Sequence, residues 1–207
     1  NLIDPSELTF EKNLKRMQVL AKTMHEDAIT AMIEGDKTLS QDIIARDVSL
    51  NGLNWLIARQ YHQFVRNPAL FEDQKIDMEE ALFYYHASFL MERIGDHAAN
   101  IAKNIPENQD NGEAETNDLM RKASQMSLKM FTMSMESWFS KNVDKADKQI
   151  DQVDELKILC EKILDKSLKM KPLQAKSIHY IIESIRRLGR YSANIAELVI
   201  DYRITHK

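Results

Sequence analysis

The chain has 207 residues, 43% of them hydrophobic, and its 28 basic and 32 acidic side chains give a formal net charge of -4. Both signs are mixed along the whole chain, which excludes a basic nucleic-acid-binding arm and an acidic tail within it. The single cysteine, Cys160, excludes an internal disulfide and a cysteine-based zinc site, and suits a reducing, cytoplasmic compartment. No apolar run approaches the roughly 18 residues of a membrane-spanning helix, so we expect no membrane insertion.

Breakers of regular structure are scarce, because only five glycines and four prolines occur in the chain. Apolar residues recur at spacings of three and four almost everywhere, which is typical of amphipathic helices. Six long helices are predicted on this basis. In chain order they run from a start at Asp4 to Gly35, from Thr38 to Asn67, from Asp77 to Pro106, from about Leu119 to Lys141, from about Val143 to Met170, and from Pro172 to about Arg203.

An internal duplication is visible when the third predicted helix is compared with the sixth. MERIGDHAANIAKN (Met91 to Asn104) and IRRLGRYSANIAEL (Ile185 to Leu198) share six identities in fourteen positions, where chance would give about one. We therefore predict an all-α fold of two tandem antiparallel three-helix bundles, joined end to end or side by side. The predicted repeats are residues 1–106 and 119–207, with a polar linker at 107–118.

The third helix carries two carboxylates on a stripe that otherwise looks buried. Glu92, Asp96 and Asn100 follow one another at intervals of four and lie on one face. Such carboxylates repel each other unless a proton, a cationic side chain or a metal ion offsets their charge. Asp47 and Asn51 form a similar pair on the second helix, and neighbouring helices of a bundle would let the two pairs face each other.

These motifs resemble the PhoU family of phosphate-uptake regulators, in which each half is a three-helix bundle with paired E/DxxxD motifs. MERIGDHAANIAKN is similar to the family signature, and GDKTLSQDIIARDVSLN (Gly35 to Asn51) matches the entry into its second helix. DPSELTFEKNLKRM, RDVSLNGLNWLIARQ and ESIRRLGRYSANIAE resemble archaeal PhoU-domain proteins that begin with an AbrB-type DNA-binding module. The resemblance covers essentially the whole chain.

The resemblance implies a non-enzymatic regulatory domain that controls phosphate uptake or phosphate-responsive gene expression through protein contacts. Its expected partners are phosphate-signalling or transporter proteins and a second copy of the chain in a homodimer. The chain begins with Asn1 instead of Met, so we expect an upstream segment to be missing. DNA would then be reached only through a missing N-terminal AbrB-like module.

The resemblance also implies a metal site in the first repeat. The family's ligands fall on Glu92 and Asp96 in the third helix and on Asp47 in the second, and Asn51 stands where a second carboxylate is usual. An amide oxygen brings no charge, which argues against a multinuclear cluster. We expect a single, weakly held divalent or ferric ion, such as Fe, Zn, Mn or Mg.

The second repeat departs from this pattern, because Arg186 and Arg190 stand where Glu92 and Asp96 stand in the first. Three interpretations remain open. The guanidinium groups could pair internally with an aspartate of the fifth helix, point to solvent, or form a basic patch that binds phosphate or an acidic partner. The aspartates considered are Asp147, Asp151 and Asp154.

The alternative function is a carboxylate-bridged metal-binding bundle or metalloenzyme. A ferritin-like di-iron site needs an ExxH pair on two of its helices. The six histidines of the chain form no such pair. The sequence therefore favours the regulatory function.

Overall fold

A computed structural model of the chain describes residues 9–105 and 114–205. The described residues form seven α-helices and one 3-10 helix, and no strand. Their bounds are α1 Phe10–Glu34, α2 Lys37–Arg66, η2 Pro68–Gln74, α3 Met78–Lys103, α4 Ala114–Ser140, α5 Val143–Ile150, α6 Gln152–Ser167 and α7 Pro172–Thr205. The all-α prediction is confirmed.

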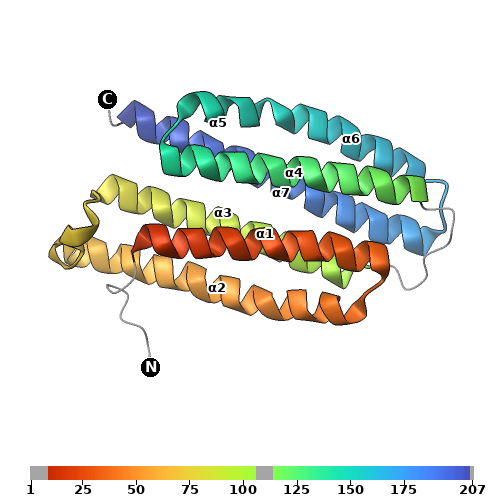
Figure 1. Cartoon of the computed structure of the whole chain (residues 1–207), viewed down its shortest axis with the longest axis horizontal. Coiled ribbons are helices and arrows are strands. Elements are labelled where there is room, and N and C mark those ends of the chain that lie inside the picture. Colours follow the sequence, from red (N-terminus) through yellow and green to blue (C-terminus); the bar gives the residue numbers. More distant parts are fainter. Residues whose placement is uncertain (1–8, 106–113, 206–207) are drawn as a thin grey trace.

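The helices form two triplets that lie side by side (Figure 1). In the first triplet α1 packs against both α2 and α3, and α2 packs against α3. In the second, α4 packs against α7 and against α5 and α6, which together take the place of one long helix. The triplets join mainly along α3 and α7, with a smaller contact between α1 and α4. The result is a row of α2, α3, α7 and α5–α6, covered on one side by α1 and α4.

The predicted fifth helix is corrected to two helices, α5 and α6. Asp151 separates them but keeps right-handed helical angles, φ -62° and ψ -27°, and its N–H still bonds to the carbonyl of Asp147 at 3.4 Å. The interruption is therefore a local distortion within one helical path. Ile150, Asp151 and Val153 are weak helix formers, which explains why it falls there.

Helix starts follow from side-chain caps. Asp77 accepts a hydrogen bond from the N–H of Glu80 at 2.7 Å, which confirms the predicted start of α3. The predicted cap at Thr38 is wrong, because Asp36 accepts from the N–H of Leu39 at 2.9 Å and starts α2 two residues earlier. Gly35, at φ 68°, ends α1 in the left-handed conformation that this tight connection requires.

Two other boundaries differ from prediction. Helix α4 begins at Ala114, before the predicted Leu119. The start proposed at Asp4 lies outside the described residues, where α1 begins at Phe10 with Thr9 as its cap. Most of the predicted linker also lies outside them.

One continuous apolar core runs through both triplets. The inward stripe of α3 includes Met91, Ile94 and Ala98, all buried, and that of α7 includes Ile185 and Leu188. The polar motifs described next lie where α3 meets α2 and where α7 meets α6. No helix in the described ranges is both long and apolar enough to serve as a membrane span.

Candidate functional site

The carboxylates singled out in the sequence meet between α2 and α3. We call this cluster the acidic seam; it consists of Asp47 and Asn51 of α2 and Glu92 and Asp96 of α3. Gly95 makes the close approach of the two helices possible. A Cβ on Gly95 would overlap the Cδ2 atom of buried Leu50 and would lie 3.7 Å from Oδ1 of Asp47. Because Gly95 has no Cβ, Leu50 of α2 can pack directly against α3. This contact also brings Asp47 beside α3.

Burial and mutual repulsion both act on the acidic seam. Burial raises the pKa of Asp47 above its ordinary value, and the charge of Asp96 raises it further. The pKa of Glu92 is raised by burial first and then by Asp96. Only 16% of the Glu92 side chain is exposed, against 35% for Asp96. The seam thus concentrates negative charge where water screens it poorly.

Arg93 offsets part of this charge, a role that the sequence analysis missed. Its Nη1 atom lies 3.1 Å from Oδ2 of Asp96, and its Nε atom lies 3.6 Å from Oε2 of Glu92. The guanidinium group also lies 4.9 Å from the ring centre of Phe89. The i, i+3 spacing between Arg93 and Asp96 was the available signal.

Two carboxylate oxygens in the seam remain without hydrogen-bond partners although they are buried, namely Oδ1 of Asp47 and Oε2 of Glu92. Asn51 turns its amide nitrogen towards Asp47 and donates to Oδ2 at 3.4 Å. Asn51 therefore acts as a donor to the neighbouring carboxylate. Buried unpaired carboxylate oxygens are costly, and a cation beside them would lower that cost.

The described residues contain no cluster of three or more His, Cys, Asp and Glu side chains arranged to hold a metal ion. The seam itself offers two buried oxygens without hydrogen bonds, one from Asp47 and one from Glu92. Its third carboxylate, Asp96, is paired with Arg93, and the amide of Asn51 donates to Asp47 instead of accepting. Its chemistry fits one weakly held cation better than a multinuclear cluster, which needs more carboxylates.

Asn100, predicted to extend the stripe of Glu92 and Asp96, faces the other repeat instead. Its Nδ2 atom donates to Oγ of Ser184 at 3.0 Å. His97 reaches the same hydroxyl at 3.3 Å, and its ring lies 5.8 Å from that of Tyr191. Burial and then Arg187 lower the pKa of His97. These contacts lock α3 to α7, so the role of His97 is packing between repeats.

The second repeat reproduces the packing of the first but not its charge. A Cβ on Gly189 of α7 would overlap Cδ2 of Leu156 on α6, just as one on Gly95 would overlap Leu50. This equivalence supplies the register that the sequence alone left undetermined. Val153 stands at the place of Asp47, and Lys157 stands at the place of Asn51.

We call Lys157, Arg186 and Arg190 the basic seam, since they occupy the places of Asn51, Glu92 and Asp96. Arg186 is 44% exposed and pairs with Glu183 of its own helix at 2.5 Å. Arg190 is exposed, and no carboxylate pairs with it in the described ranges. The three candidate partners from the sequence, Asp147, Asp151 and Asp154, are themselves exposed. The observed partner of Arg186 thus comes from a helix that the prediction did not consider.

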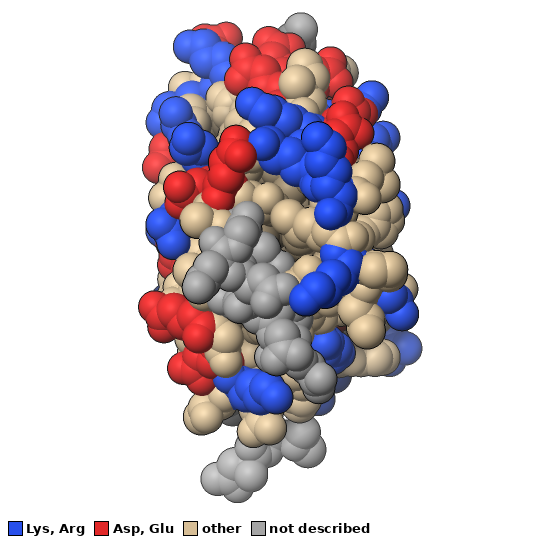
Figure 2. Space-filling view, turned by 90° about the vertical axis from the view of Figure 1, so that its right-hand side faces the viewer, with Lys and Arg blue, Asp and Glu red and all other residues tan. Residues whose placement is uncertain are grey.

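A further group of cations lies near the C-terminal end of α6, where a shallow hollow is lined by Lys162, Lys166 and Lys169. Glu161 and Asp165 line the same hollow. Figure 2 shows positive and negative side chains interleaved over this end of the molecule. Because lysines and carboxylates alternate in this hollow, its electrostatic potential is not of one sign, unlike that of either seam.

His25 was not singled out as a site in the sequence but is the most strongly perturbed histidine with a resolved shift. Its Nε2 atom lies 2.9 Å from Oγ of Ser124, across the contact between α1 and α4. Burial, and then His97, lower the pKa of His25 to about 3. Its position on the apolar stripe with Ala21, Ala28 and Met32 was the signal that could have found it.

A doubled helical triplet with a carboxylate seam in one copy defines the class of this protein as a tandem-repeat helical bundle. The PhoU domain matches residues 14–105 and again residues 120–199, most of the chain, and the chain belongs to this family. A curated relative from Clostridium acetobutylicum, a "Phosphate-specific transport system accessory protein PhoU homolog", is 25% identical over 205 residues and covers 94% of this chain and 90% of its own length.

Solved structures share the fold. PhoU from Pseudomonas aeruginosa superimposes with a TM-score of 0.81 at 20% identity, over 96% of each chain. The phosphate transport system regulatory protein PhoU from Streptococcus pneumoniae gives 0.79 at 20% identity, over 92% of this chain and 91% of its own.

Proposed function

We propose that this chain is a non-enzymatic regulator of phosphate transport that acts through contacts with transporter or phosphate-signalling proteins. The observation that carries the proposal is the pair of PhoU-domain matches, one on each triplet. The relative from Clostridium acetobutylicum, described as an accessory protein of phosphate-specific transport, supports the same assignment.

Phosphate uptake in cells that lack the gene for this chain tests the proposal. Uptake of labelled phosphate is measured after growth in scarce and in abundant phosphate. We expect uptake to lose its dependence on phosphate supply, and to regain it when the chain is returned. An unchanged response to phosphate would refute the proposal.

The acidic seam is proposed to hold one cation as part of this regulation. Asp47 and Glu92 would bind it through the two buried oxygens that make no hydrogen bond, and Asp96 would add negative charge. The ion supplies positive charge that offsets the repulsion within the seam and stiffens the α2–α3 pair. Arg93 competes for Asp96, so binding is expected to be weak.

Titration with Mn²⁺ and Zn²⁺, followed by isothermal calorimetry, measures this site directly. We expect one weak site per chain that disappears in the double variant Glu92→Gln with Asp96→Asn. The matched control, Glu183→Gln, removes a carboxylate from the equivalent helix of the second repeat and should leave binding intact. Equal binding by the double variant would refute the assignment of the site without touching the phosphate-regulation proposal.

A further inference from the structure

The connection between α6 and α7 exposes two large apolar side chains at one end of the molecule. We call residues 168–173 the α6–α7 turn; they follow the last residue of α6 and include the first two of α7. Leu168 and Leu173 are 80% and 79% exposed, more than any other large hydrophobic side chain of the described residues. This end lies at the right of Figure 1 and faces the viewer in Figure 2. Two such leucines in one turn exceed the isolated apolar side chains that are ordinary on a protein surface.

The backbone of the α6–α7 turn is held in place. The N–H of Lys169 donates to the carbonyl of Lys166 at 3.3 Å, and that of Met170 donates to the carbonyl of Ser167 at 3.0 Å. Met170 is partly buried and packs against the apolar core. The turn therefore points one apolar side chain inward as an anchor and leaves its two leucines in water.

The same segment is positively charged. Residues 166–182 include four lysines and no acidic residue. The lysines are Lys166, Lys169, Lys171 and Lys176. Lys166 pairs with Glu115 at 2.8 Å, whereas no carboxylate in the described ranges pairs with Lys169 or Lys176. The first turn of α7 has no acidic residue, so the positive end of its helix dipole adds to the charge of the lysines.

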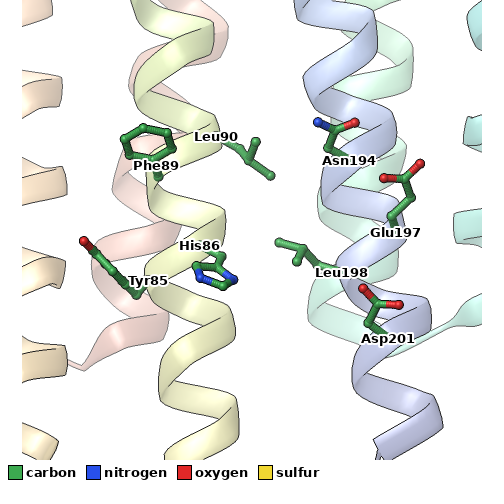
Figure 3. A pocket seen from close by; sticks show the side chains of 8 residues that line it. All are labelled: Tyr85, His86, Phe89, Leu90, Asn194, Glu197, Leu198 and Asp201. Atoms are coloured by element: carbon green, nitrogen blue, oxygen red, sulfur yellow. The ribbon is translucent and has the colours of Figure 1, made fainter.

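Carboxylates of α7 lie far from this turn. Glu197 and Asp201 line a cavity of about 490 Å³ between α3 and α7, on the opposite side of it from Leu90 (Figure 3). They follow Leu173 at a distance of roughly 40 Å along the helix. Helix α7 is thus basic and apolar where it begins and carries carboxylates near its end. A negatively charged surface would attract its beginning and repel the wall of the cavity.

We propose that the α6–α7 turn docks on the surface of a lipid bilayer that contains anionic lipids. The lysines would approach the lipid phosphates, and Leu168 and Leu173 would leave water between the headgroups. Burial of apolar side chains and attraction to anionic lipids act together in such a contact. The contact is peripheral and differs from a membrane span, for which no helix in the described ranges is suited.

A bilayer fits this turn better than an acidic protein surface does. The two leucines project from the tip of a helical hairpin, so a protein partner would need a pocket for each of them. A bilayer instead deforms around a convex apolar tip. Lysine suits lipid phosphates, because its ammonium group is a compact charge on a flexible stem that can lie along apolar surface. The proposal does not rest on the regulatory function, since the contact requires neither phosphate ions nor a transporter.

Cosedimentation of the whole chain with protein-free vesicles tests the proposal. Vesicles of equal parts phosphatidylglycerol and phosphatidylcholine are compared with vesicles of phosphatidylcholine alone, to which we expect at least about tenfold weaker binding. The variant Lys169→Gln with Lys171→Gln should bind the anionic vesicles roughly 25-fold more weakly, at about fivefold for each lysine. The variant Leu168→Ser with Leu173→Ser should bind them more than about tenfold more weakly.

Matched controls change the same residue types elsewhere. Lys145→Gln with Lys148→Gln removes two exposed lysines from α5. Leu70→Ser changes a leucine of η2 that is 55% exposed. Both controls should bind anionic vesicles as the unaltered chain does. Every altered side chain is exposed, and circular dichroism verifies that each variant keeps its helical content.

Four results would overturn the proposal. They are no binding to the anionic vesicles, equal binding to both kinds of vesicle, binding that survives either change in the turn, and binding that the controls lose equally. Retention on membranes that contain the cell's proteins, but not on protein-free vesicles, would assign the turn to an acidic membrane protein and would also overturn it. None of these results bears on the regulation of phosphate transport, which the uptake measurement tests separately.

Discussion

The tight contact at Gly95 leads to a quantitative prediction for Gly95→Ala. The new methyl group would overlap Cδ2 of Leu50, a fully buried side chain that cannot move without disturbing its neighbours. Overpacking a core by one carbon costs about 1–3 kcal/mol, and replacing a mid-helix glycine returns up to about 1 kcal/mol of helix propensity. We therefore expect Gly95→Ala to lower the free energy of unfolding by about 1 kcal/mol.

Urea denaturation measures this change against a control that the chain itself provides. Gly52 lies mid-helix in α2, and nothing lies within 4 Å of a Cβ placed on it. Gly52→Ala should raise stability by about 0.5–1 kcal/mol, since only the propensity gain applies. The variant Leu50→Ala alone should cost about 2–5 kcal/mol. Combined with Gly95→Ala it should cost less than the sum, because the clash is gone. If Gly95→Ala stabilises the chain as much as Gly52→Ala does, the assigned helix contact is wrong.

Three further changes test the site and the repeat contact. The raised pKa of Glu92 means that its ionised form costs stability in the folded chain, so Glu92→Gln should stabilise the protein at neutral pH. In urea titrations this gain should vanish as pH falls below the ordinary glutamate value of 4.5. Because the pKa of His25 is lowered by folding, the imidazole takes up a proton in the unfolded chain at a higher pH than in the folded chain. The free energy of unfolding should therefore fall as the pH is lowered from 6.5 to about 3, by up to about 1.4 kcal/mol per pH unit. His25→Gln should flatten that part of the profile, and an unaltered slope would exclude His25 as its source. Arg186→Glu should change stability by only about 0.5 kcal/mol, because the lost pair with Glu183 is partly exposed and Arg187 retains that carboxylate; a loss of several kcal/mol would indicate a buried partner.

The helical fold and the meeting of Asp47 with Glu92 and Asp96 could be predicted because both follow from periodicity. Residues four apart share a helix face, and adjacent helices of a triplet must present faces to each other. Periodicity along one helix does not say which residue of the next helix it meets. Only the structure shows that Gly95 of α3 lies against Leu50 of α2.

Because periodicity does not set the register between helices, the sequence could not identify the partners of Arg186 and Arg190 in the second repeat. Helix five contains several aspartates at helical spacing, and the sequence could not place any of them against α7. The Gly189–Leu156 contact fixes the register and puts Val153 and Lys157 at the seam. Contacts between repeats, such as His25 with Ser124, depend on the angle between triplets and leave no local signal beyond a polar residue on an apolar stripe.

The two repeats show that packing and surface charge are separate constraints on a duplicated bundle. Gly95 and Gly189 admit equivalent leucines, so the helix-to-helix distance is maintained in both copies. The residues three before and one after each glycine are free of that constraint. There a pair of acids in one copy corresponds to a pair of arginines in the other. Had both copies kept carboxylates, each face would carry two repulsive seams and would require two cations. With one seam inverted, only the acidic seam calls for a cation, which the proposed ion would supply.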